Sequence, residues 1–374
     1  MPRDWCVRAL VAGTFLLTLV VAQIRESLLD GQAELEVTVE NATTGARMPA
    51  RLYLFRDGRP LRFTPVESML PLLPDLQYRD HLWKAKPRPV TLEVTYKGES
   101  HLMLLDGHAT FALPAAEYRI DAYRGLFYRP ASEEFRLEAG KRTKITLEMA
   151  PWAGSRTAEW LSADDHIHLT RRQEDDDVFL RWIQAEDLSV GNFLQLQRQM
   201  DGAVQYAFGR AGEARAPGYS IRPGHESRSF YYGHLNILGP SEMQRPLSVG
   251  TEYGNSPEAY PFPLVVFGRG RALGGTVGYA HFNGTAGNSS PHSTFLMDVA
   301  LGSIDFAEVF QAARLRLDDW YAILNAGFRL TGIAGSDFPV SMGKAGGWPR
   351  AIPLLGPERT LVHSKPGASA YENW

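Results

Sequence analysis

The sequence has a single cysteine, Cys6, which lies in an apolar segment at the N-terminus. The rest of the chain has no thiol, so a disulfide framework and a cysteine-ligated metal are excluded there. Any metal must therefore be held by His, Asp or Glu. An excess of basic charge is also missing, because 39 Lys and Arg stand against 42 Asp and Glu. Without a positive field we expect no nucleic-acid partner, and a small-molecule substrate instead.

The N-terminal segment, residues 1–22, combines Arg3 and Arg8 with an apolar run that ends at Ala22. A basic start, an apolar stretch and a small-residue exit are typical of a secretory signal peptide. An uncleaved membrane anchor is the alternative, although the run falls short of the about 20 apolar residues that span a bilayer. We therefore expect a secreted or periplasmic protein, which meets a membrane only if this segment remains as an anchor.

The chain of 374 residues, 44% of them hydrophobic, exceeds one ordinary core and predicts two domains. The first, residues 33–150, is rich in short alternating segments and has no helical pattern. Apolar and polar residues alternate in 33–40, 51–55, 90–96, 118–123 and 143–149, with glycine-containing turns between them. This pattern predicts an all-β sandwich. The stretch from Asn41 to Leu54 resembles the first hairpin of carboxypeptidase-regulatory-like domains.

The second predicted domain, residues 155–374, alternates strand-like and helical patterns. We predict strands near 166–169, 188–194, 233–239, 275–281, 306–310 and 331–336, and helices at 177–187, 256–272 and 315–327. This alternation, with polar residues where the strands end, predicts an α/β barrel. Active sites of such barrels gather at the carboxyl ends of the strands.

The segment Ala163-Asp-Asp-His-Ile-His-Leu169 contains a His-x-His motif on a predicted strand. Successive strand residues point to opposite faces, so His166 and His168 project to the same side, about 6 to 7 Å apart along the strand. Two imidazoles so placed can share one metal ion. The alternative is two polar residues on a solvated strand face.

Further His, Glu and Asp residues follow the later strand-like runs. They occur in 224–228 (Gly-His-Glu-Ser-Arg), 232–239 (Tyr-Gly-His-Leu-Asn-Ile-Leu-Gly), 275–282, 305–309 and 333–337. This order resembles the polymerase and histidinol phosphatase (PHP) superfamily. The short sequence motifs at 160–168, 233–239, 298–302 and 320–329 are similar to those of one group in this superfamily, the CehA/McbA-type metallohydrolases. The resemblance covers about 155–374.

The resemblance implies a PHP-like distorted (β/α) barrel and a set of metal ligands. Matched residue by residue, these ligands are His166, His168, Glu226, His234, His281 and Asp337. Glu252 competes with Glu226 for the carboxylate role. A core histidine at His281 and a helix cap at Asp337 remain alternatives.

The chain departs from the family at two ligand positions. Asn192-Phe193 stands where many members have Asp-His, and Pro339 stands where they have a closing histidine. Two ligands of the usual three-metal cluster are therefore missing, and we predict one or two divalent ions of zinc, manganese or iron. In members of the family, the domain continues beyond the position of the last residue of this sequence. One interpretation is therefore that the domain is truncated at its C-terminus here.

The chemistry that follows is hydrolysis of an ester-type bond by a metal-bound hydroxide. Asp337 would orient or deprotonate the water, and His234 or Arg228 would polarise the substrate oxygen. Candidates to fix the imidazole tautomers are Asp164, Asp165 and Glu308. The substrate class stays open between a carbamate or aryl ester and a phosphoester. The alternative function is a catalytically inactive secreted protein whose β-sandwich binds a glycan or a partner.

Overall fold

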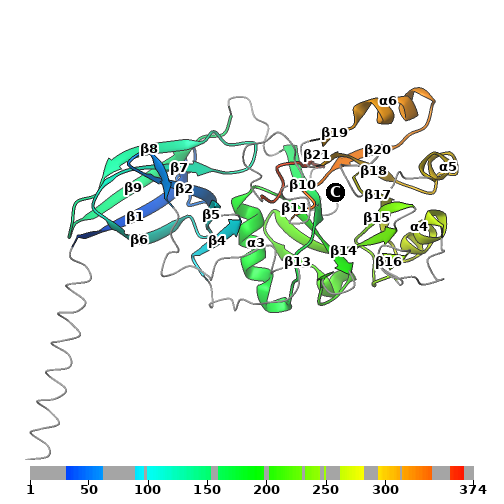
Figure 1. Cartoon of the computed structure of the whole chain (residues 1–374), viewed down its shortest axis with the longest axis horizontal. Helices are drawn as coiled ribbons and strands as arrows, with labels where there is room; N and C mark the ends of the chain where they lie inside the picture. The colour runs from blue at the N-terminus through cyan, green and yellow to red at the C-terminus, as the bar shows by residue number, and fades with distance from the viewer. Residues whose placement is uncertain are drawn as a thin grey trace, which may run out of the picture.

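The computed structural model describes residues 31–61, 89–96, 99–152, 159–197, 202–229, 232–244, 248–249, 262–281, 294–311, 314–338 and 354–365. The predicted signal peptide or anchor, residues 1–22, lies outside these ranges. Within them, no helix combines the length and apolarity needed to cross a membrane. Strands β1 to β9 come first along the chain, and a sheet flanked by helices follows (Figure 1).

The first part consists of two sheets packed face to face. The smaller sheet has the order β6-β1-β9, with β1 at Gln32–Asn41, β6 at His108–Pro114 and β9 at Arg142–Met149. The larger sheet has the order β4-β5-β2-β7-β8, with β3 paired to β2. Its strands are β2 Ala50–Arg56, β3 Arg59–Leu61, β4 Thr91–Tyr96, β5 Glu99–Leu104, β7 Glu117–Tyr123 and β8 Ala131–Arg136.

The core of this part follows from the period-two pattern of its strands. In β1 every second side chain is buried, and Leu35, Val37 and Val39 are fully enclosed. They share one buried cluster with Leu52 of β2 and Phe111 of β6, so the apolar faces of the two sheets meet. The predicted all-β sandwich is confirmed.

The second part is built on one mixed sheet whose main path runs β19-β18-β17-β15-β14-β11-β10-β21. The path strands are β10 Trp160–Ile167, β11 Val190–Gln197, β14 Tyr219–Ser229, β15 Gly233–Leu238, β17 Thr276–Tyr279, β18 Phe306–Gln311, β19 Arg314–Leu315 and β21 Thr360–His363. Off the path lie β12 Gly202–Ala203, β13 Ala214–Ala216, β16 Ser248–Val249 and β20 Thr331–Ala334.

This sheet curves into a nearly closed barrel. Strand β20 pairs in parallel with β18, and a parallel bridge just after β20 joins Phe338 to Ile167 at the end of β10. The ring therefore runs β10-β11-β14-β15-β17-β18-β20 and back to β10. Strand β15 is antiparallel to both of its neighbours, whereas the other pairs in the ring are parallel. The predicted distorted α/β barrel is confirmed, and the reversed β15 is its distortion.

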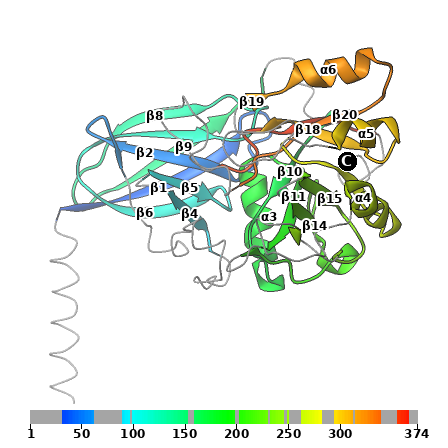
Figure 2. The ribbon, with the colours of Figure 1, turned by 45° about the vertical axis from the view of Figure 1, so that its right-hand side comes forward.

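The helices lie outside this barrel (Figure 2). They are α3 Asp176–Ala185, α4 Pro263–Ala272, α5 Phe295–Ala300 and α6 Leu317–Asn325, with the 3-10 turns η2 Gln173–Asp175 and η3 Gly209–Gly212. The predicted helices at 177–187 and 315–327 correspond to α3 and α6. Of the predicted helix at 256–272, residues 263–272 form α4, which starts at Pro263, a residue favoured at the first helical position.

One strand of the barrel, β14, was not predicted from the sequence. It carries Pro223 and Gly224, two residues that normally argue against a continuous strand. A Cβ atom added at Gly224 would lie 2.7 Å from Cδ2 of Leu194 and 2.7 Å from the backbone oxygen of Ile237. Glycine therefore lets the neighbouring strands approach closely. Close packing of β11, β14 and β15 thus overrides the preference of Pro223 and Gly224 against a continuous strand.

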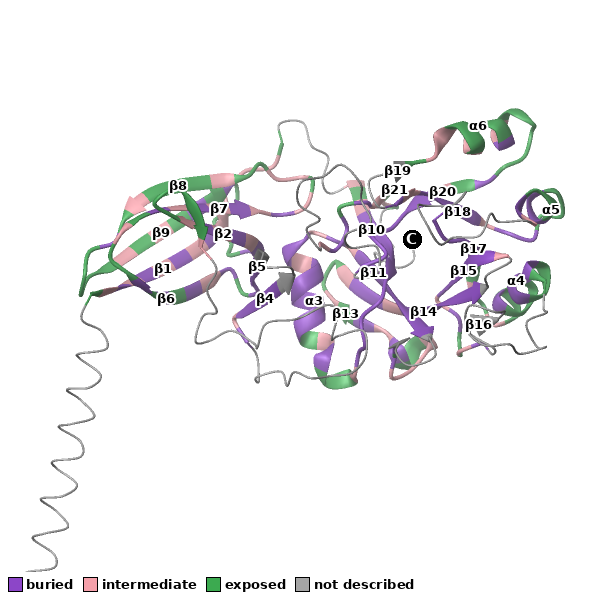
Figure 3. Ribbon diagram, viewed as in Figure 1, coloured by how far each residue is buried: buried purple, intermediate pink, exposed green. Residues whose placement is uncertain are grey.

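Helix α3 lies where the two parts of the protein meet. Figure 3 shows it largely buried beside β4, β5 and the barrel strands. Leu92 of β4 and Met103 of β5 belong to the same buried cluster as Trp182 of α3. Polar contacts add to this junction, since Arg181 donates to the backbone oxygen of Pro89 at 2.6 Å. The sandwich and the barrel therefore share one hydrophobic core.

Candidate metal centre

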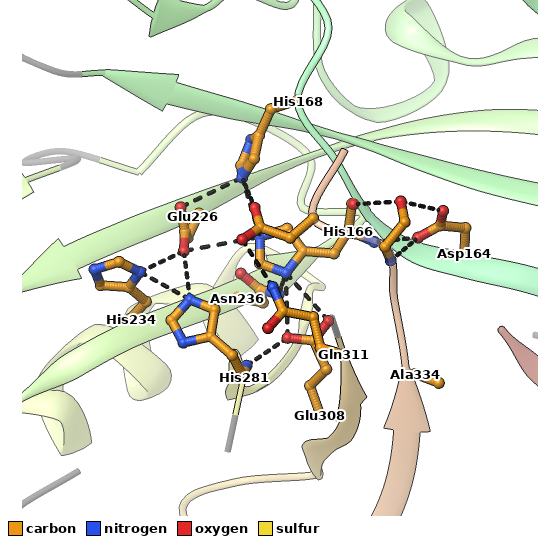
Figure 4. Close-up of polar contacts among 12 residues, drawn as sticks. Asp164, His166, His168, Glu226, His234, Asn236, His281, Glu308, Gln311 and Ala334 are labelled. Atoms are coloured by element: carbon orange, nitrogen blue, oxygen red, sulfur yellow. Dashed lines mark hydrogen bonds and ion pairs between the residues drawn. The ribbon is translucent and has the colours of Figure 1, made fainter. Parts of the chain in front are cut away.

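The six side chains that the sequence singled out as metal ligands meet at one rim of the barrel. Figure 4 labels five of them, all except Asp337. They form two groups, His166-His168-Asp337 and Glu226-His234-His281, and the candidate ligand atoms of each group lie within 4.8 Å of one another. Most of these residues stand at or just after the carboxyl ends of their strands. His234 stands near the amino end of β15, and the reversal of that strand brings it to the same rim.

The His-x-His motif has the geometry that strand alternation predicts. His166 is the penultimate residue of β10 and His168 follows its end. Both are fully buried, and their Nε2 atoms are 3.0 Å apart. Oδ1 of Asp337 faces both atoms, at 3.5 Å from His166 and 3.4 Å from His168. Three ligand atoms therefore point toward one place between β10 and the segment after β20.

Glu226 of β14 connects the two groups. Its Oε1 atom lies 2.8 Å from Nδ1 of His234 and 3.4 Å from Nε2 of His281. Its Oε2 atom lies 3.4 Å from Nε2 of His168. One carboxylate thus presents an oxygen to each group, which is the arrangement required of a ligand shared by two cations.

The second group contains its own pair of facing imidazoles. Nδ1 of His234 and Nε2 of His281 are 2.9 Å apart, and both approach Glu226. The buried Arg228 lies directly opposite His234 in the β14–β15 ladder. Its Nε atom is 3.1 Å from Nε2 of His234 and 3.5 Å from Oε2 of Glu226. A permanent positive charge therefore borders this group.

Two of the six residues have left-handed backbones. His281 has φ +33° and Asp337 has φ +51°, and only Asp57 and Asp187 share this property among the described residues other than glycine. Such conformations cost about 1–3 kcal/mol and persist only where the surroundings enforce them. The concentration of strain at the ends of β17 and β20 indicates that the fold holds these two side chains in place against local preference.

The first two imidazoles are oriented by groups behind them. Both oxygens of Glu308 lie 3.2 Å from Nδ1 of His166, and Oε2 also accepts a hydrogen bond from the backbone N–H of His281. Nδ1 of His168 lies 3.1 Å from the carbonyl oxygen of Leu194. Because carboxylates and carbonyls only accept, both Nδ1 atoms carry the proton and both Nε2 lone pairs are left for a cation. The prediction that Glu308 fixes a tautomer agrees with this geometry.

Asp164 and Asp165 do not have that role. The carboxylate of Asp164 accepts hydrogen bonds from the backbone N–H groups of His166 at 3.0 Å, Ser336 at 2.9 Å and Gly356 at 2.8 Å. It therefore ties β10 to the segment that leads into Asp337 and contacts no imidazole ring. Asp165 also makes no ring hydrogen bond, and burial raises the pKa of its carboxyl well above the usual value. Neither residue fixes an imidazole tautomer.

Two amide side chains that sequence reasoning missed touch the ligands. Gln311, at the end of β18, donates from Nε2 to Oδ2 of Asp337 at 2.7 Å. Asn236, opposite Glu226 in the ladder, places Nδ2 3.4 Å from Nδ1 of His166. A signal existed for both, because each is a polar residue near a strand end and within three positions of a predicted site residue.

The first group is built to hold positive charge. Burial alone would lower the pKa of His166, but Glu308 and Asp337 outweigh burial and raise this pKa well above its usual value. Burial alone would raise the pKa of Asp337, yet the neighbouring His166 and His168 hold it below its usual range. The carboxylates thus favour a cationic charge between these rings, where a divalent cation would take the place of protons.

Two ligands of the second group, Glu226 and His281, are in protonation states that bind cations. Burial opposes ionisation of Glu226, but Arg228 and His234 outweigh burial and hold its pKa well below the usual range. Burial lowers the pKa of His281 to about 4, so this imidazole is neutral near pH 7. Ionised carboxylate and neutral imidazole are the forms that coordinate zinc, manganese or iron. The donor sets of both groups therefore fit a divalent cation.

The remaining sequence candidates can be placed only in part. Glu252 and Pro339 lie outside the described residues. Asn192 is fully buried and donates from Nδ2 to the backbone oxygen of Asp164 at 3.2 Å, behind the first group. An amide bonded to the main chain in this way holds β10 and β11 together.

No protein-family model matches the chain, and no curated protein matches it significantly. Among solved structures, PsfC from Pseudomonas syringae is similar with a TM-score of 0.38 and 15% identity, over 57% of this chain and 87% of that one. A two-domain protein from Bacteroides vulgatus containing a predicted PHP-like metal-dependent phosphoesterase has a TM-score of 0.33 and 16% identity, over 48% of this chain and 52% of that one.

The minor pilin GBS52 from Streptococcus agalactiae is similar with a TM-score of 0.22 and 14% identity, over 33% of this chain and 45% of that one. This chain thus spans about half the length of two of the three proteins. Similarities this low assign no activity, and the site has to be judged on its own geometry.

Proposed function

We propose that this protein is a metal-dependent hydrolase of the PHP type, similar to CehA/McbA-like enzymes, that acts on an ester-type bond. One observation carries the proposal: six buried residues from strands far apart in sequence converge in two groups that share Glu226. Each group offers three ligands, so the centre has room for one or two ions. Buried carboxylates and imidazoles facing one another are costly unless a cation or protons compensate them.

The roles of the residues follow from their positions. A divalent cation held here would lower the pKa of bound water from about 15.7 toward 7 and so supply hydroxide at ordinary pH. Asp337 is ionised at neutral pH and faces the first group through Oδ1, so it is suited to orient the attacking water. Arg228 and His234 lie at the opposite side of the centre, where they would polarise the substrate oxygen.

The substrate we propose is a small molecule with a carbamate, aryl ester or phosphoester bond. The guanidinium of Arg228 contacts two of the six candidate ligands, Glu226 and His234. A single guanidinium can donate hydrogen bonds to a neutral carbonyl oxygen or to one phosphoryl oxygen. We further propose that the protein works outside the cytoplasm, because of the signal-like segment at residues 1–22.

The competing hypothesis is a secreted binding protein without activity. The absence of ligands at Asn192 and Pro339 favours it. The tautomer control by Glu308 and the strained backbones of His281 and Asp337 oppose it, because a barrel without a metal would gain stability by losing them. We therefore prefer the hydrolase.

The test is a metal and activity assay on the full chain and on matched variants. The wild-type protein, the Glu226→Gln variant and the control Glu213→Gln would be loaded with zinc, manganese or iron(II). Metal content would be measured, followed by assays with nitrophenyl phosphates, phosphodiesters, aryl esters and carbamates. We expect wild type and Glu213→Gln to bind metal and hydrolyse one of these classes, and Glu226→Gln to lose both properties.

Two results would overturn the proposal. Wild-type protein that binds none of these metals would remove its basis. A folded, metal-free and inactive protein that retains a glycan would support the binding hypothesis instead.

A further inference from the structure

The residue after Asp337 anchors this candidate ligand in the hydrophobic core. Phe338 is 1% exposed, and its backbone oxygen accepts a hydrogen bond from the N–H of His168 at 2.5 Å. Its ring meets that of Trp182 edge to face, with 5.6 Å between centroids. Because Asp337 has a left-handed backbone, its side chain can face His166 and His168 only while Phe338 is held in this position.

Trp182 connects this anchor to the junction with the sandwich. It is fully buried in α3, and its helix packs against β2 and β5 of the sandwich. Trp182 and Phe338 belong to one buried cluster with four sandwich residues, namely Leu92, Val94, Met103 and Leu105. An apolar path therefore runs from the sandwich through α3 to the residue next to a candidate metal ligand.

The larger sheet of the sandwich carries buried apolar residues on both of its faces. In β5, Leu102 and Leu104 point into the sandwich core, whereas Met103 and Leu105, the residue that follows the strand, belong to the cluster that contains α3. All four are buried. A sheet that served only as a separate binding module would have one apolar face and one polar face. Here part of the second face, at Leu92, Val94 and Met103, is apolar because the barrel part packs against it.

We infer that the sandwich is the supporting wall of the metal centre, and that Trp182 and Phe338 are positioning residues for Asp337. Leu105 and its neighbours fix α3, α3 fixes the ring of Phe338, and Phe338 holds the strained Asp337 against the first group. This inference rests on the proposed metal site. The second group, Glu226-His234-His281, is linked to the first through Glu226 and Glu308 rather than through Phe338, so it serves as the less affected reference.

The sequence provides a matched pair of substitutions to test this inference. Leu104→Ala and Leu105→Ala delete the same atoms from adjacent, fully buried residues, the last of β5 and the one that follows it, but from different hydrophobic clusters. Phe338→Leu and Phe111→Leu form a second pair, because both rings are buried and only Phe338 contacts Trp182. Leu105→Met, which conserves volume, is the conservative rescue.

The readout is zinc occupancy at each group, measured by anomalous X-ray scattering from crystals equilibrated at graded zinc concentrations. Calorimetric titration of the full chain gives the affinities in solution. We expect Leu105→Ala and Phe338→Leu to weaken zinc binding at His166-His168-Asp337 by about tenfold, the lower end for residues that orient metal ligands. The second group should weaken less than the first, and Leu105→Met, Leu104→Ala and Phe111→Leu should match the wild type at both groups.

The possible failures are distinguishable. Wild-type protein without zinc at either group overturns the proposed function, and with it this inference. Wild-type zinc at both groups, with equal affinities in Leu104→Ala and Leu105→Ala, overturns the inference alone. Equal weakening at both groups would mean that Leu105 acts through general stability and would also overturn it.

Discussion

Gln311 donates a hydrogen bond from Nε2 to Oδ2 of Asp337 across 2.7 Å. The other carboxylate oxygen, Oδ1, faces the Nε2 atoms of His166 and His168. Gln311 is 3% exposed, so water does not compete for this bond. The amide therefore selects which oxygen Asp337 presents to the first group, a role that the family resemblance did not suggest.

Replacing Gln311 by leucine tests that role. Gln311→Leu leaves Oδ2 of Asp337 without its donor, and the carboxylate is then free to rotate away from His166 and His168. We expect the zinc affinity of the first group to fall about tenfold. Isothermal calorimetry would measure it, with Gln195→Leu as the control, because Gln195 is a buried strand-end glutamine bonded to the backbone of Gln205 and to no ligand. Equal affinities in the two variants would contradict the assignment.

Glu308→Gln tests the orientation of His166. The amide keeps the shape of the side chain but loses the negative charge that holds the proton on Nδ1 of His166. We expect metal affinity to fall by about 10 to 100-fold while thermal stability changes little. Zinc titration and calorimetric melting of the same preparation would measure both quantities. A variant that binds zinc as tightly as the wild type would show that the tautomer is set elsewhere.

Gly335→Ala should damage the centre because there is no room for a methyl group. A Cβ at Gly335 would lie 2.2 Å from Oδ1 of Asp165, 2.6 Å from Cβ of His166 and 2.8 Å from Oε1 of Glu308. Strand β10 and β20 would have to separate, so we expect lower stability and lost metal binding. Gly268→Ala is the control, because it lies in α4 with open space around it and should stabilise the helix by up to about 1 kcal/mol. Denaturant unfolding would measure the free energy of unfolding of both variants. Similar values for the two would contradict the packing described around Gly335.

The sandwich should lose stability in mild acid because of His101. This residue is buried, its Nδ1 lies 2.6 Å from the hydroxyl of Tyr53, and burial together with the charge of Arg51 lowers its pKa from 6.5 to about 3. Between these pH values the unfolded chain binds a proton that the folded chain does not, so the free energy of unfolding falls as pH falls. The maximum slope is about 1.4 kcal/mol per pH unit.

The measurement is urea unfolding between pH 7 and pH 4, on wild type and His101→Gln. The variant should show a shallower decrease in stability over this range. Some slope should remain, because burial also lowers the pKa of His225 to about 3. Parallel curves for the two proteins would refute the assignment to His101.

The ligands were predictable because their signals are local. His166 and His168 face the same side through strand alternation alone, and the other ligands follow apolar runs that could be recognised one at a time. The strand that carries Glu226 was missed because Pro223 and Gly224 break its local pattern. Gln311 and Asn236 were missed because an amide, unlike an imidazole or a carboxylate, is not a usual metal ligand, although both lie within three positions of a predicted site residue.

The sequence by itself determined the chemical character of this protein: no thiol ligands, no basic field, an all-β first part, and histidines and carboxylates at strand ends. Only the tertiary structure decided how these residues are combined. The reversal of β15 brings His234 to the common rim, Glu226 reaches both groups, and part of the outer sandwich face packs in one cluster with α3. Periodicity reports the face on which a residue lies, whereas the order and direction of strands depend on packing between segments distant in the chain.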